Sequence, residues 1–134
     1  MADEKTFKLK IISPDRVFFE DDVTMVELAT SEGEMGVYAG HIPLTSVLVP
    51  NTVKIHKGDD VKKAAIHSGF IEVMPDSVTI LAEIAEWPDE IDVNRANEAR
   101  IRAERRLASR DSNVKVMRAE LALKRSLARL GAVD

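Results

Sequence analysis

The sequence predicts an α+β protein with an N-terminal β-sandwich of about ten short strands, followed by a C-terminal antiparallel two-helix hairpin. Up to about residue 85 apolar residues alternate with polar ones, and beyond residue 90 they recur at helical spacing. Turn-forming residues recur every 8–12 positions in the first part. The net charge changes from −9 over residues 1–90 to +5 over residues 91–134. We therefore predict two units, 1–88 and 89–134.

The first predicted strand shows the alternation clearly. Phe7, Leu9 and Ile11 fall on one face, and Lys8 and Lys10 fall on the other. Aromatic residues make up only 4% of the chain, so we expect a core of aliphatic side chains and methionine. Many short strands with frequent turns are typical of a sandwich or a barrel. The further strand candidates are 17–19, 23–29, 44–49, 52–56, 61–67, 69–74 and 77–84.

The C-terminal part has the signals of two helices. Asp92 is a good N-cap residue, and residues 93–108 contain neither glycine nor proline. A turn over 109–113 precedes a second helix over 114–130, which we expect to end before Gly131. A joint of five residues between two helices is typical of an antiparallel hairpin.

The apolar stripes of the two helices differ. The first helix has one thin stripe, and the second has two stripes on roughly opposite sides, which implies two neighbours, held together or in alternation. The first helix carries Ala96, Ala99, Ala103 and Leu107, and the second carries Val114, Met117, Leu121 and Ala128 on one side and Val116, Leu123, Leu127 and Leu130 on the other.

Arginines form a triplet with the spacing i, i+7 and i+11 on each helix. They are Arg95, Arg102 and Arg106, and Arg118, Arg125 and Arg129. One interpretation is a solvated face whose long stems shield the apolar stripe. The other is a phosphate cradle, because guanidinium groups match phosphate oxygens. Helical geometry alone does not decide whether both triplets share one edge of the hairpin.

A hairpin of about 40 residues is marginally stable by itself, so its state should depend on what it contacts. A ligand at 100 times its dissociation constant contributes about 2.7 kcal/mol, which is enough to shift a balanced two-state element. The sequence therefore favours a switch.

Several function classes are disfavoured. The chain contains no cysteine, and His41, His56 and His67 lack ligand spacing, so we expect neither a disulfide nor a zinc site. There is no P-loop motif, and no nucleophile, base and orienting partner occur together, so we expect a non-catalytic protein. No apolar run approaches about 20 residues and no signal peptide is visible. We expect a soluble protein that associates with a membrane only through a partner.

Several motifs in order resemble the epsilon subunit of the bacterial F-type ATP synthase. They are Phe7-Lys8-Leu9, Ser13-Pro14-Asp15, Ser31-Glu32-Gly33-Glu34-Met35-Gly36-Val37-Tyr38 with Gly40-His41, Ser68-Gly69-Phe70-Ile71-Glu72-Val73 and Val78-Thr79-Ile80-Leu81-Ala82-Glu83. Ala39 departs from the usual proline. The resemblance covers nearly the whole chain and implies a non-catalytic subunit of the central stalk, peripheral on the cytoplasmic face of the cell membrane.

The resemblance also implies partners and a regulatory role. The sandwich would bind the gamma subunit and rest on the c-ring, which couples proton flow to ATP synthesis. The hairpin would fold on the sandwich, or extend toward the catalytic head of alpha and beta subunits and inhibit ATP hydrolysis. Glu34 matches a family position that faces the c-ring, and His41 lies in a turn that the family directs toward its partners.

Some bacterial members of this family bind ATP in the folded hairpin. Ile91-Asp92-Val93-Asn94-Arg95-Ala96 matches their motif of Ile or Leu, Asp, two variable residues, Arg and Ala. The resemblance thus implies ATP as a regulatory ligand, with Mg²⁺ left open. The phosphates would be contacted by Arg95, Arg102, Arg125 and Arg129, and the base and ribose end would be shaped by Glu86, Ile91, Asp92 and Ala96.

Two alternatives stay open. The chain could be the same coupling subunit without nucleotide sensing, acting only through protein–protein contacts. Nucleic-acid binding through the arginine-rich helices is disfavoured by the overall charge of −4, by interleaved glutamates and by the scarcity of aromatic stacking residues.

Overall fold

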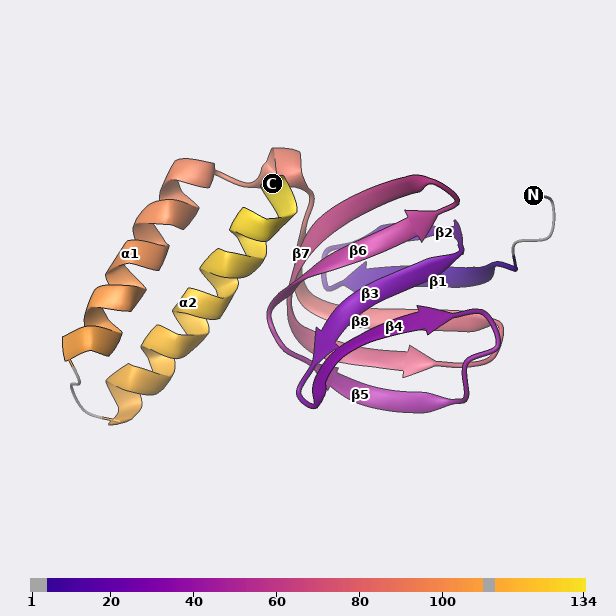
Figure 1. The fold of residues 1–134 in the computed structure, drawn as a ribbon, viewed down its shortest axis with the longest axis horizontal. Helices are drawn as coiled ribbons and strands as arrows, with labels where there is room; N and C mark the ends of the chain where they lie inside the picture. The colour runs from indigo at the N-terminus through magenta and orange to yellow at the C-terminus, as the bar shows by residue number, and fades with distance from the viewer. Residues whose placement is uncertain (1–4, 110–112) are drawn as a thin grey trace.

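The fold class predicted from the sequence is confirmed in the computed structural model, which describes residues 5–109 and 113–134 (Figure 1). Over these residues eight strands are followed by one 3₁₀ turn and two helices. The elements are β1 (Phe7–Ser13), β2 (Arg16–Val23), β3 (Met25–Thr30), β4 (Gly33–Tyr38), β5 (Leu44–Leu48), β6 (Asn51–Lys57), β7 (Asp60–Val73), β8 (Ser77–Glu86), η1 (Pro88–Glu90), α1 (Val93–Ser109) and α2 (Asn113–Val133).

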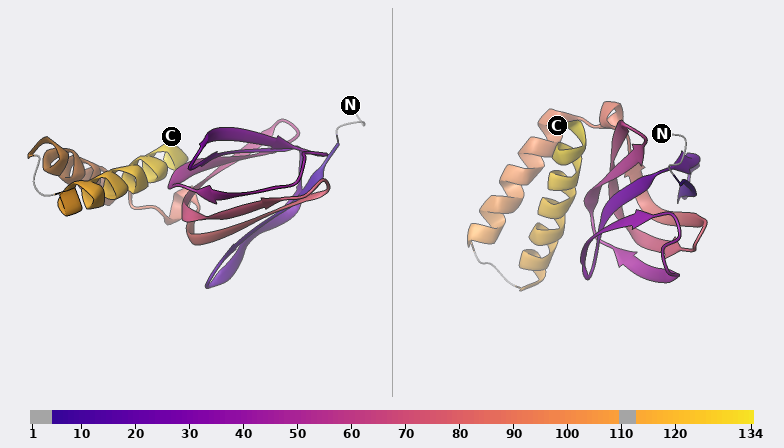
Figure 2. Two further views of the ribbon diagram at one scale, coloured as in Figure 1. Left: turned by 90° about the horizontal axis from the view of Figure 1, so that it is seen from below. Right: turned by 45° about the vertical axis from the view of Figure 1, so that its right-hand side comes forward.

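The strands form one sheet that folds on itself into two layers (Figure 2). The strand order is β2-β1-β8-β7-β5-β3-β4, and β6 pairs with both β3 and β7. On one side β7 pairs with β8 along most of its length, and on the other side it pairs first with β6 and then with β5. The long strand β7 therefore joins the two layers.

β7 bends at Ser68 and Gly69, which both have positive φ angles, of 55° and 146°. A Cβ atom at Gly69 would lie 2.0 Å from the carbonyl oxygen of Leu81, so this close approach of β8 requires glycine. The sequence predicted two strands over 61–67 and 69–74. These two segments form the single strand β7 because pairing with β8 continues past the bend. This is one reason why the described residues form eight strands and not the predicted number of about ten.

The sandwich core consists of the alternating residues that the sequence predicted. Phe7, Leu9 and Ile11 are buried to 3% exposure or less. At the exit of the sandwich Trp87 stacks on Phe18, with ring centroids 4.1 Å apart. This stacking fixes the start of the segment that leads from β8 to α1.

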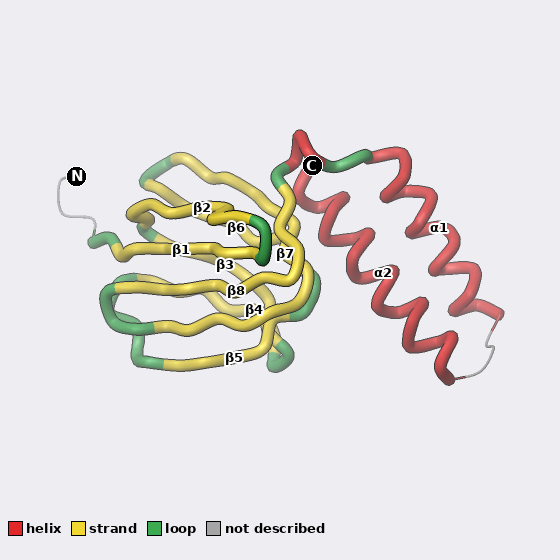
Figure 3. Tube along the Cα trace, turned by 180° about the vertical axis from the view of Figure 1, so that it is seen from behind, coloured by secondary structure: helices red, strands yellow, loops and turns green. Residues whose placement is uncertain are grey.

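The hairpin lies at one end of the sandwich (Figure 3). α1 packs along α2, and α2 lies next to β6 and β7. The N-cap prediction for Asp92 is confirmed, because its Oδ1 accepts a hydrogen bond of 3.1 Å from the backbone N–H of Arg95. The alanine stripe of α1 is also confirmed, since Ala96 and Ala103 are buried against α2. Of the turn predicted over 109–113, residues 110–112 lie outside the described part of the chain.

One expectation about the second helix is wrong. α2 does not end before Gly131 but continues to Val133, because Gly131 lets the helix pack directly against Thr52 of β6. The two neighbours that the two apolar stripes imply are present, because α2 packs on α1 and on β6 and β7. Met117, at 70% exposure, and Leu127, at 51% exposure, stay outside these contacts. Small residues allow closer approach, and among the side chains described on α2 the buried ones are Ala119, Ser126, Ala128 and Ala132.

Among the helices described, none is long and apolar enough to cross a membrane.

Candidate functional site

A cavity of about 410 Å³ lies where the end of β8, η1, α1 and α2 meet. Seven of the eight residues that the sequence predicted for a nucleotide site line it, and Arg125 does not. Helical geometry left open whether the two arginine triplets share an edge, and the cavity wall includes residues of both triplets. The lining residues are Glu86, Glu90, Ile91, Asp92, Arg95, Ala96, Ala99, Arg102 and Arg129.

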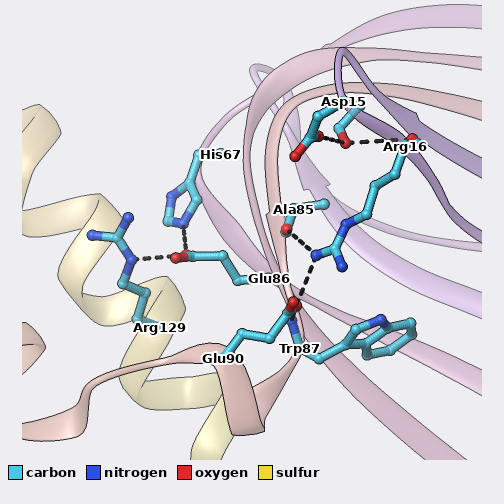
Figure 4. Close-up of polar contacts among 9 residues, drawn as sticks. Asp15, Arg16, His67, Ala85, Glu86, Trp87, Glu90 and Arg129 are labelled. Atoms are coloured by element: carbon cyan, nitrogen blue, oxygen red, sulfur yellow. Dashed lines mark hydrogen bonds and ion pairs between the residues drawn. The ribbon is translucent and has the colours of Figure 1, made fainter.

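Glu86 connects the sandwich to α2 (Figure 4). Its Oε1 atom accepts a hydrogen bond of 2.8 Å from Nε of Arg129, and the same atom lies 2.8 Å from Nε2 of His67. The side chain of Glu86 is 21% exposed and that of Arg129 is 29% exposed, so solvent screens this ion pair only partly. Position 86 is the last residue of β8, and this places its carboxylate beneath the helix.

Two arginines of the cavity lining lack an ion-pair partner in the part of the chain that the structure describes. Within the described residues Arg95 and Arg102 form no ion pair. The nearby carboxylates are already engaged, because Glu86 pairs with Arg129 and Asp92 caps α1. Ala96 and Ala99 are small and leave room between the two guanidinium groups and the sandwich. The guanidinium groups of Arg95 and Arg102 are donors suited to the oxygens of an anion.

Glu90 lines the cavity but belongs to a separate ion pair. Its Oε1 accepts hydrogen bonds of 2.7 Å from Arg16 and of 2.8 Å from the backbone N–H of Trp87. The bond from Arg16, helped by the Trp87 N–H, holds the pKa of the Glu90 carboxyl below its usual range. η1 is thereby tied to β2 (Figure 4). This contact holds the part of the cavity wall that precedes Ile91.

Arg125 lies one helical turn before Arg129. Its Nε atom is buried and has no hydrogen-bond partner among the described residues. A buried guanidinium N–H without an acceptor is costly. α2 therefore carries, outside the cavity lining, a buried donor that a side-chain rotation could bring to an acceptor.

Three residues at or beneath the cavity were not predicted from the sequence: Glu90, Ala99 and His67. Ala99 was visible only as part of the alanine stripe, and Glu90 only as the residue before the Ile91-Asp92 motif. His67 sits in an apolar run of β7 and gave no signal beyond its failure to match a zinc pattern.

The two predicted partner-binding residues, Glu34 and His41, do not line this cavity. Glu34 is exposed and is the second residue of β4, which begins at Gly33. His41 follows the other end of β4, in a loop where its Nδ1 lies 2.8 Å from the carbonyl oxygen of Ile42. Glu34 also lines a larger hollow of about 650 Å³ beside the end of α2. That hollow carries no arginine, and we place the candidate site in the smaller cavity.

Comparison with known proteins gives consistent matches over nearly the whole chain. The ATP synthase delta/epsilon chain beta-sandwich domain matches residues 6–88, and the long alpha-helix domain of the same chains matches residues 89–134. An ATP synthase epsilon chain of Bacillus cytotoxicus is 46% identical over 126 residues, which cover 94% of this chain and 95% of that protein. Another from Caldanaerobacter subterraneus is 44% identical over 128 residues, covering 95% and 93%.

Solved structures show the same fold. A chain in the Euglena gracilis mitochondrial ATP synthase structure of OSCP, F1 and c-ring matches with a TM-score of 0.82 and 26% identity, covering 96% of this chain and 82% of that one. A chain in the central stalk and c-ring of the Tetrahymena thermophila enzyme has a TM-score of 0.64 at 14% identity, with 98% of both chains covered, and supports the fold alone. Both domains, the bacterial relatives and the shared architecture lead to one conclusion: the chain belongs to the ATP synthase delta/epsilon chain family, as an epsilon chain of the central stalk.

Proposed function

We propose that this epsilon chain senses ATP, and that the docked hairpin binds the nucleotide in the cavity between α1, α2 and the end of β8. The observation that carries the proposal is the assembly of seven predicted residues, from three separate elements, around one cavity. Its volume of about 410 Å³ falls in the ordinary range for small-molecule sites, roughly 300–1,000 Å³. The chain itself would bind ATP without hydrolysing it.

The division of roles follows the charges. Arg95 and Arg102 of α1 and Arg129 of α2 would hold the phosphates, while Ile91 and Ala96 give an apolar surface for the base. Glu86 and Asp92 would receive donors from the base or the ribose. Arg125 would complete the site by turning its unsatisfied guanidinium to the ligand.

ATP would stabilise the docked state of the hairpin. A ligand that contacts α1, α2 and β8 together binds only while the hairpin is docked, so it stabilises that state by mass action. Without ATP the helices would extend toward the alpha/beta head and inhibit ATP hydrolysis. Exposed Met117 and Leu127 on the docked α2 support this part of the proposal, because the extended helix needs apolar side chains for new neighbours.

The sandwich would couple the rotor, with the gamma subunit bound to one of its outer faces. A row of apolar side chains crosses five strands there in register, and four of them are about half exposed. Such a patch is typical of a protein interface. Glu34 would face the c-ring, at the cytoplasmic face of the cell membrane, and the turn with His41 would contact a partner subunit. The row consists of Val17, Ile12, Leu81, Phe70 and Val47.

Calorimetric titration of the full chain tests nucleotide sensing, with ATP and ADP, each with and without Mg²⁺. We expect ATP to bind more tightly than ADP, and the double variant Asp92→Ala with Arg95→Ala to lose binding. Arg105→Ala is the matched control, because Arg105 is exposed on the same helix but does not line the cavity. No heat of binding with the unmodified chain would leave the alternative, a coupling subunit that acts only through protein contacts.

A further inference from the structure

His67 is a fully buried histidine beneath the docked hairpin. It lies two residues after Ala65 on β7, so both side chains point to the same face of the strand. Ala65 packs in one cluster with Ala128 and Ala132 of α2. Docking of α2 therefore covers the face of β7 on which His67 lies.

The geometry defines the protonation state of this imidazole. Nε2 lies 2.8 Å from Oε1 of Glu86, whereas Nδ1 is buried without a hydrogen-bond partner in the described part of the chain. A carboxylate oxygen needs a donor, so Nε2 carries the proton. Nδ1 is then unprotonated, because an N–H there would be buried without an acceptor. His67 is a neutral donor in the docked state.

We propose that His67 is a positioning residue of the nucleotide pocket: its Nε2–H fixes the carboxylate of Glu86, and through it the guanidinium of Arg129. The inference rests on the proposed function of the cavity. Both bonds end on Oε1 of Glu86, which leaves Oε2 for a donor of the ligand. Without His67 the carboxylate keeps one protein partner instead of two, and its rotation would carry Arg129 out of position.

The burial of His67 beneath α2 makes docking of the hairpin on the sandwich sensitive to acid. The charged groups that face His67 are Glu86 of β8 and Arg125 and Arg129 of α2. Burial lowers the pKa of His67 from its ordinary value of 6.5, and it outweighs the opposing effect of the hydrogen bond to Glu86. The undocked state consequently binds more protons. Docking and ATP affinity stay constant above about pH 6.5 and decrease as the pH falls below it toward the lowered pKa.

The test compares His67→Gln with His67→Ala in the full chain. The glutamine amide can place a donor near the position of Nε2 but does not titrate. At about pH 7.5 we expect His67→Ala to weaken ATP binding about tenfold and His67→Gln to stay within about twofold of the unmodified chain. Between about pH 7.5 and pH 5.5 the affinity of the unmodified chain should fall more steeply than that of His67→Gln. ATP's own protonation affects both proteins equally and cancels in this comparison.

Each result has a defined meaning. Equal pH profiles of the unmodified chain and His67→Gln, or undiminished affinity of His67→Ala at both pH values, would overturn the positioning role while leaving ATP binding intact. Absence of ATP binding by the unmodified chain would overturn the proposed function and this inference together. If His67→Ala does not fold, the pH comparison with His67→Gln still decides. The ¹⁵N shifts of the His67 ring give an independent readout, because they distinguish the Nε2–H tautomer from imidazolium.

Discussion

Ala128 of α2 gives the most direct test of how the hairpin is held. Its side chain is 3% exposed and packs against Ala65 of β7, and its carbonyl oxygen accepts a hydrogen bond of 2.9 Å from Oγ1 of Thr52. We expect Ala128→Glu to release the hairpin and leave the sandwich folded. The matched control is Leu127→Glu, because Leu127 is the adjacent residue and is 51% exposed.

The magnitude follows from the small size of the contact. Three buried alanine methyl groups contribute about 0.8 kcal/mol each, and the hydrogen bonds from Thr52 and Arg129 contribute about 1 kcal/mol each. The contact is thus worth roughly 4–5 kcal/mol before the entropy of ordering the hairpin is subtracted. Burial of an unpaired carboxylate costs several kcal/mol, which equals or exceeds this sum. The undocked state should then predominate.

Hydrogen exchange measured by mass spectrometry provides the assay. Because an isolated hairpin of this length is marginally stable, amides of α2 should exchange about a hundredfold faster in Ala128→Glu, whereas amides of β7 and β8 keep their protection. Leu127→Glu should exchange like the unmodified chain, and only Ala128→Glu should lose ATP binding, since Arg129 moves away with the helix. Full protection of α2 in Ala128→Glu would refute the reasoning.

Three further predictions follow from single contacts. Phe18→Ala should lower the free energy of unfolding of the sandwich by about 3–5 kcal/mol in urea titrations, because the ring is buried against Trp87. Asp92→Ala should destabilise the first turn of α1 by about 1 kcal/mol, measured by amide exchange of that turn, because the N-cap hydrogen bond is lost. Glu90→Gln should flatten the acid dependence of the free energy of unfolding below about pH 4.5. The lowered pKa of Glu90 contributes stability above this pH, and that stability is lost as the pH falls further toward the lowered pKa.

Each of these variants has a partner variant that isolates the effect. Phe70→Ala removes a ring that is 54% exposed, so it should leave stability nearly unchanged and weaken only gamma binding. Asp92→Asn keeps an oxygen that can accept the N-cap bond, and equal losses in both Asp92 variants would contradict the capping role. Glu98→Gln changes an exposed carboxylate on α1, and the same flattening there would show that Glu90 is not responsible.

The local pattern was enough to predict most of the fold. Alternation assigned Phe7, Leu9 and Ile11 to the core, and the combination of Asp92 with a helix free of glycine and proline located the start of α1. These features depend on neighbours in the chain, which a sequence displays directly. The end of α2 was mispredicted because Gly131 normally stops a helix, whereas here its lack of a side chain allows contact with Thr52, distant in sequence.

For the candidate site too, some features could be predicted from the sequence and others depended on tertiary packing. The sequence by itself determined the cationic character of the hairpin and the family resemblance, because these depend on residue type, spacing and the order of motifs. That resemblance implied the seven predicted residues that line the cavity. Only the tertiary structure decided that both arginine triplets contribute to one cavity, and that α2 buries alanines against its neighbours while Met117 and Leu127 stay exposed. It alone brought His67 of β7, Glu86 of β8 and Arg129 of α2 together. The reason is physical: the packing of a helix across strands depends on shape and close approach between distant segments, and no local period encodes it.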